Sequence, residues 1–221
     1  MGTFARGAEA GREMAGTRAV TSIDSSTSIT RMLIFETPRL RLRPLESGDE
    51  ALYRQLYTDP EVMRHIGVPM TVEAAGRSFR IACRVATRDG ASAERWVVSE
   101  RGSPAAIGLL GMIPDETSAD EAEIGLMLLP ERQRRGVAVA VIGAVADRLF
   151  RPLGEDAFDF QALQTRHAPA NVAMMRLMLR LGFLRQPACS PDQTEVSWLM
   201  TRDRWNAGDL GRGIEKRDEH R

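Results

Sequence analysis

A basic, glycine-containing turn opens directly onto the most apolar helix that the sequence predicts. The stretch PERQRRGVAVAVIGAVADRLF, residues 130–150, carries three arginines and a glutamine before Gly136. The helix behind it is made of small and aliphatic residues, so it has little bulk and can pack close to a sheet. The first turn of a helix leaves backbone N–H groups unpaired and carries a partial positive charge, and both favour a bound anion. This stretch therefore predicts a helix packed on a sheet, with a diphosphate site at its start.

The basic run also has a simpler interpretation, because short basic segments before a helix are usually solvated loops. Two better-known phosphate motifs do not fit the stretch. A P-loop needs a lysine followed by serine or threonine, and the dinucleotide-binding fingerprint needs more glycines than this turn supplies.

The rest of the chain alternates between strand-like and helix-like segments. Residues 39–42 (RLRL) alternate strictly, which indicates a half-buried strand. Ser47 is expected to cap a helix that ends near Tyr57, and Pro60 stands at the start of a short helical turn. We further expect a helix over 71–86, strands over 96–99, 105–113, 121–129 and 157–163, a helix over 169–181, and strands near 183 and 195–200. The order predicts α/β structure of the α+β type, with antiparallel hairpins in the middle of the chain.

Length and charge exclude several classes of protein. A chain of 221 residues with 43% hydrophobic content forms one domain, which we place at residues 32–206. We expect residues 1–31 to be a disordered extension without a secretory signal, Met32 to be a possible start, and residues 207–221 to be a flexible tail. A formal net charge of +0 argues against nucleic acid and membrane surfaces as partners.

Cysteine and hydropathy patterns point the same way. Cys83 and Cys189 lie far apart and form no CxxC motif, so we expect no disulfide framework and no metal site. A reducing cytoplasm suits this usage. The longest strongly apolar run, residues 137–146, is much shorter than the roughly 20 residues of a membrane-spanning helix.

The basic turn resembles the acyl-CoA-binding motif of the GNAT superfamily of N-acetyltransferases, in which Gln133, Gly136 and Ala138 occupy the motif positions. The flanking stretches resemble the branch related to ribosomal-protein alanine acetyltransferases: ETPRLRLRPL, DPEVMRHIG, AEIGLMLLP, NVAMMRLMLRLGF and LMTRDRW. The resemblance implies a central, mostly antiparallel mixed sheet flanked by helices. Two parallel strands, expected at 121–129 and 157–163, would splay apart in it.

The resemblance also implies acetyl-CoA as co-substrate. Its pantetheine arm would take backbone hydrogen bonds from Met127 and Leu129, and an N–H of Leu128 or a neighbour would serve the thioester oxyanion. The pyrophosphate would lie on the amides of Gln133, Arg134, Arg135, Gly136, Val137 and Ala138. Asn171 would contact the arm and Arg176 would reach the adenosine end. The simpler alternatives are a helix cap for Asn171 and solvated helix surface for Arg176.

The resemblance implies Glu123 as the base that receives the proton of the amine, although it could instead be the structural partner of an arginine. Met178 and Met174 stand where many relatives carry a tyrosine and a serine, so no thiolate-protonating acid is visible. Arg64, His65 and His167 are the candidates for the acceptor pocket. We expect direct acetyl transfer to a primary amine, either a peptide N-terminus or a small molecule, by a monomer or homodimer. A GNAT-like module that binds acyl-CoA or a partner protein without transfer is the alternative.

Overall fold

One sheet organises the part of the chain that the computed structural model describes, namely residues 34–86, 94–115, 118, 120–150, 160–188 and 193–208. Within these residues, eight strands follow the order β1-β2-β3-β4-β5-β6-β8-β7. Only β5 and β6 pair in parallel among them, which confirms the predicted mixed, mostly antiparallel sheet. The strands are β1 (Phe35–Glu36), β2 (Leu40–Pro44), β3 (Glu94–Glu100), β4 (Ala106–Pro114), β5 (Glu121–Leu128), β6 (Ala162–His167), β7 (Leu184–Arg185) and β8 (Val196–Thr201).

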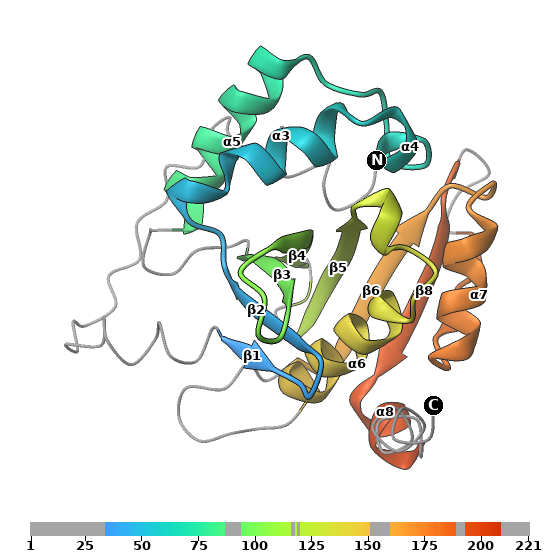
Figure 1. Ribbon diagram of the computed structural model, residues 1–221. Helices are drawn as coiled ribbons and strands as arrows, with labels where there is room; N and C mark the ends of the chain where they lie inside the picture. The colour runs from blue at the N-terminus through green and yellow to red at the C-terminus, as the bar shows by residue number, and fades with distance from the viewer. Residues whose placement is uncertain are drawn as a thin grey trace, which may run out of the picture.

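Helices cover both faces of this sheet (Figure 1). They are α3 (Glu50–Thr58), α4 (Pro60–Met63), α5 (Val72–Ala86), α6 (Val137–Phe150), α7 (Val172–Arg180) and α8 (Arg202–Ala207), with short 3-10 turns at Ser47–Asp49 and Pro130–Arg132. Side chains on a strand alternate between faces, so β5 contributes to two separate cores. Met127 packs with α3, α4 and α5, whereas Ile124 and Leu128 pack with α6 and α7.

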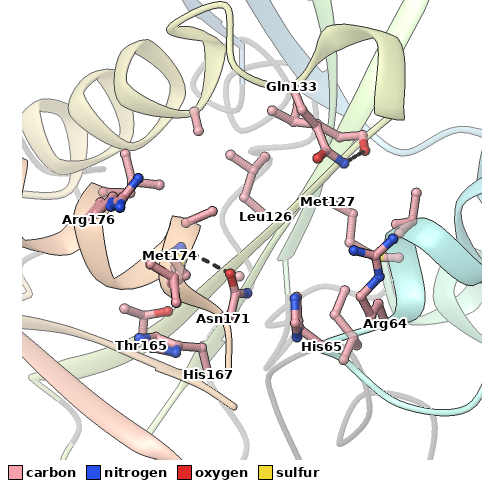
Figure 2. Close-up of a pocket in the computed structure, with 18 of the residues that line it drawn as sticks. Arg64, His65, Leu126, Met127, Gln133, Thr165, His167, Asn171, Met174 and Arg176 are labelled. Carbon is pink, nitrogen blue, oxygen red and sulfur yellow. Dashed lines mark hydrogen bonds between the residues drawn. The ribbon is translucent and has the colours of Figure 1, made fainter. Parts of the chain in front are cut away.

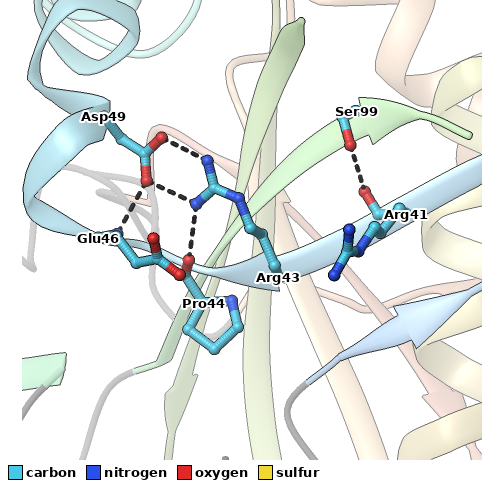
Figure 3. A network of polar contacts seen from close by, with 6 residues as sticks. All are labelled: Arg41, Arg43, Pro44, Glu46, Asp49 and Ser99. Atoms are coloured by element: carbon cyan, nitrogen blue, oxygen red, sulfur yellow. Dashed lines mark hydrogen bonds and ion pairs between the residues drawn. The ribbon is translucent and has the colours of Figure 1, made fainter. Parts of the chain in front are cut away.

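The link from β2 to α3 is fixed by a charge-assisted network rather than by a serine cap (Figure 3). Arg43 donates two hydrogen bonds of 2.7 Å to the carboxylate of Asp49, and the Glu46 backbone N–H donates to the same carboxylate at 2.8 Å. Asp49 stands at the N-cap of α3. The prediction that Ser47 caps this helix was therefore wrong, because the capping position lies two residues later.

Most predicted elements are confirmed, but the strand expected at 157–163 was misplaced. Its part before residue 160 lies outside the described residues, and β6 continues past the predicted end at Leu163 to His167. Residues 1–31 and most of the predicted tail, 209–221, also lie outside the described residues. Among the helices that are described, none has the length and apolar character needed to cross a bilayer.

Candidate active site

A slot opens where β5 and β6 stop pairing. Their register contains Glu121 with Ala162, Ala122 with Leu163, and Glu123 with Gln164. Beyond that point β5 continues to Leu128 and β6 to His167, with a cavity of about 710 Å³ along them. Its wall includes residues of α4 on one face of the sheet and of α6 and α7 on the other. The cavity therefore passes between the two strands and joins the two faces.

The β4–β5 register decides which backbone groups face this slot. Leu129 N–H donates to Ile107 O at 3.0 Å, and Asp115 N–H donates to Glu121 O at 2.8 Å. Hydrogen-bonded and non-bonded pairs alternate in an antiparallel ladder, so the odd-numbered residues of β5 bond to β4. The peptide groups of Leu126 and Leu128 consequently turn toward the slot. This corrects the expectation for Met127 and Leu129, whose backbone groups point to β4.

The basic turn lies at the end of β5 beside this cavity. Gln133 Nε2 donates to Leu128 O at 3.1 Å, which ties the turn to the strand (Figure 2). Arg134 and Gly136 have φ values of 61° and 76°, and successive turns of this kind gather backbone N–H groups into an anion-binding nest. A Cβ on Gly136 would meet no atom within 4 Å. Glycine is therefore required here by the left-handed backbone rather than by close approach of another atom.

The structure brings most of the predicted cofactor residues to the cavity wall. Those that line it are Met127, Leu128, Gln133, Arg134, Gly136, Ala138, Asn171 and Arg176. Leu129, Arg135 and Val137 are not in the wall. Val137 is 5% exposed and belongs to the core, and Arg135 points into solvent. These three side chains can thus assist an anion only indirectly, through the conformation of the turn.

Asn171 acts as the N-cap of α7, in agreement with the simpler of its two interpretations. Its side-chain oxygen accepts a hydrogen bond of 3.0 Å from the Met174 backbone N–H. Asn171 also lines the cavity. Because Oδ1 serves the cap, any contact with a ligand there would be made by the Nδ2 donors.

The predicted acceptor residues come from two different elements. Arg64 and His65, at and just after the end of α4, lie across the cavity from Asn171, Met174 and Arg176 (Figure 2). His167 is on β6 rather than in a loop, and it is 5% exposed. Its Nε2 accepts from Trp198 Nε1 at 2.8 Å, so Nδ1 carries the proton and donates to Ala168 O at 2.8 Å. Both ring nitrogens therefore serve the fold, which contradicts the predicted polar role of His167 in the acceptor pocket.

Comparison with known proteins identifies the family. The family model of the acetyltransferase (GNAT) domain matches residues 39–184. The chain belongs to the GNAT acetyltransferase family. It is 28% identical to Uncharacterized N-acetyltransferase YoaA of Bacillus subtilis (strain 168) over 153 residues, which are 69% of this chain and 84% of that protein.

Solved structures share the GNAT fold with this chain. Spermidine N-acetyltransferase from Vibrio cholerae, in complex with CoA and spermine, superposes with a TM-score of 0.64 at 18% identity, over 77% of this chain and 99% of that one. An acetyltransferase of the GNAT family from Bacillus anthracis gives 0.62 at 20% identity, over 77% and 99% of the two chains. At these identities the likeness concerns the fold.

In this GNAT protein, Glu123 sits at the last pairing point of β5 and β6. The carboxylate is 7% exposed, and its Oε2 accepts a hydrogen bond from Arg166 Nη2. Arg166 lines the cavity, whereas Glu123 does not. The geometry favours the alternative in which Glu123 is the partner of an arginine, and its role as a base remains a prediction.

Sequence reasoning missed three residues of the slot, namely Leu126, Thr165 and Arg166. Two of them lie in ALQTRH, whose polar letters were assigned to a loop. The signal that was available is period 2: Leu163, Thr165 and His167 share one face of β6, and Gln164 and Arg166 share the other. Across the described residues, no group of three or more His, Cys, Asp or Glu side chains could hold a metal ion.

Proposed function

We propose that this protein transfers an acetyl group from acetyl-CoA directly to a primary amine. The observation that carries the proposal is the slot between β5 and β6, which connects the two faces of the sheet next to a nest of backbone N–H groups. A transfer of this kind needs a thioester and an amine that approach each other from different directions. A passage through the sheet meets that requirement.

Each part of the cavity matches one part of acetyl-CoA. The turn at 133–138 offers backbone N–H groups, the start of α6 and the cavity-lining Arg134 to a pyrophosphate. The peptide groups of Leu126 and Leu128 would hydrogen-bond the amides of the pantetheine arm, as an added strand would. A backbone N–H of the same strand, that of Leu128 or a neighbour, would donate to the oxyanion that forms on the thioester carbonyl.

The amine would enter from the face covered by α4. Arg64 and His65 line that entrance together with Glu61, so the entrance carries both signs of charge. We infer a primary amine as acceptor, either a peptide N-terminus, as in the branch related to ribosomal-protein alanine acetyltransferases, or a small molecule. The Vibrio cholerae relative was solved with spermine, which makes polyamines part of any screen. Cys83 is a free thiol, as expected of a protein in a reducing cytoplasm, where we place the reaction.

A non-catalytic function is the second candidate, because the expected acids are missing. Met178 is 0% exposed and packs in the core, and Met174 packs against that core at the cavity wall. A protein of this kind would bind acetyl-CoA tightly and release no CoA with any amine.

One experiment separates these functions. Calorimetry measures acetyl-CoA affinity, and a thiol reagent follows CoA release with N-terminal peptides, polyamines, amino acids and aminoglycosides, on a monomer or dimer sized in parallel by light scattering. Binding with amine-dependent CoA release supports the enzyme. Binding without release across the whole panel supports the non-catalytic module, and the absence of binding refutes both.

A further inference from the structure

Thr165 is a buried polar residue at the point where the slot begins. It directly follows Gln164, the last residue of β6 that pairs with β5. Its side chain is on the same face of β6 as Leu163, whose neighbours in the core include α6 and α7. Thr165 is 1% exposed and belongs to the cavity wall. It therefore marks the apex of the slot on the face where the basic turn lies.

The hydroxyl of Thr165 has no task in holding the described part of the fold together. Within the described residues, Oγ1 makes no hydrogen bond, and it is not among the orphaned atoms sealed from solvent. Its neighbours on β6 are used differently: Arg166 binds Glu123, and His167 binds Trp198 and Ala168. A buried hydroxyl is normally hydrogen-bonded, so one that faces a cavity is poised to bind a ligand.

The position of Thr165 indicates which ligand atom it would meet. A thioester that reaches the apex from the α6 and α7 face places its sulfur beside β6, while its carbonyl lies against β5. The remaining wall near Thr165 includes Asn171, which caps α7, and the thioether of Met174 (Figure 2). Neither His167 nitrogen has a proton to spare. Thr165 Oγ1–H is thus the side-chain donor best placed for the sulfur.

We propose that the Thr165 hydroxyl donates a hydrogen bond to the sulfur of CoA and stabilises the departing thiolate; this inference rests on the proposed function. The amine nitrogen forms a bond to the thioester carbon, the carbon–sulfur bond breaks, and its electron pair stays on the sulfur. Thr165 keeps its proton. The proton shed by the amine leaves through Glu123 or water, and the thiolate later takes one from solvent to give CoA–SH.

The test compares Thr165→Val, which keeps the shape and removes the hydroxyl, with Thr165→Ser, which keeps the hydroxyl. The pKa of the CoA thiol is measured in the complex from the ultraviolet absorbance of the thiolate. We expect wild type and Thr165→Ser to hold that pKa below its value in free CoA, and Thr165→Val to raise it. A hydrogen bond to a charged acceptor predicts that Thr165→Val lowers kcat by about 10- to 100-fold.

Controls separate this idea from a loss of structure or of function. Thr58→Val removes a hydroxyl from α3 outside the cavity and should leave the thiol pKa unchanged. If Thr165→Val does not fold, the wild type still decides, because a bound thiol that titrates at or above the pH of free CoA contradicts the proposal. A wild type that binds neither acetyl-CoA nor CoA refutes the proposed function as well. One that binds and turns over, with kcat and thiol pKa unchanged in Thr165→Val, refutes this inference alone.

Discussion

Replacement of Gly108 by alanine should damage the slot without touching its surface. Gly108 on β4 lies opposite Leu128 on β5, in a pair that does not exchange hydrogen bonds. A Cβ there would be 2.7 Å from Leu128 Cδ2 and 3.3 Å from Leu128 Cα, and it would collide with the Met127 carbonyl oxygen as well. An ordinary carbon contact is about 3.5 Å, so β5 must move by roughly 0.8 Å.

That displacement falls on the strand that forms one wall of the slot. Overpacking of this kind costs about 1–3 kcal/mol of unfolding free energy. In a chain of this size each kcal/mol lowers the melting temperature by about 2–4 °C. A shift near 1 Å in reacting groups can lower the rate by about 100-fold, so kcat/KM should fall more steeply than stability does.

The assay pairs chemical denaturation with calorimetric titration of acetyl-CoA. Gly48→Ala is the matched control, because a Cβ at Gly48 meets nothing within 4 Å. That variant should be neutral or slightly more stable, since alanine reduces the freedom of the unfolded chain. If Gly108→Ala unfolds at the same denaturant concentration as Gly48→Ala and binds acetyl-CoA equally well, the close approach of β4 to this wall has no consequence and the reasoning fails.

Three further predictions follow from single contacts. Arg166→Met should destabilise the protein by about 2–4 kcal/mol because it leaves the Glu123 carboxylate buried without its partner; Glu123→Gln with unchanged kcat at every pH would remove Glu123 from the mechanism. Asn171→Ala should cost about 1 kcal/mol of unfolding free energy through the lost cap, and Asn171→Asp should restore stability; recovery of acetyl-CoA affinity in the aspartate variant would show that the Nδ2 donors are not needed. Burial raises the pKa of the Cys83 thiol, so its thiolate fraction, and its alkylation rate, should stay below those of a free cysteine until more alkaline pH; peptide mapping, which separates it from Cys189, would contradict this if both sites reacted like free cysteine at neutral pH.

The sequence by itself determined the elements whose cause is local. The basic turn and α6 are contiguous, so Gly136 and the small residues behind it predict the anion site within a single stretch. The alternation in RLRL identifies β2 for the same reason, and Pro60 marks the start of α4. The family followed from these contiguous motifs and their order along the chain.

The tertiary structure alone decided how the polar residues of β6 are used. Gln164 and Arg166 bind Glu121 and Glu123, partners 43 positions away in the sequence, and His167 binds Trp198. A strand with this composition reads as a loop, because the groups that satisfy it are supplied by neighbouring strands and not by its own sequence. The same holds for the backbone of β5: whether Met127 or Leu128 faces the slot depends on the phase of its hydrogen bonds with β4, which a one-residue slip would reverse.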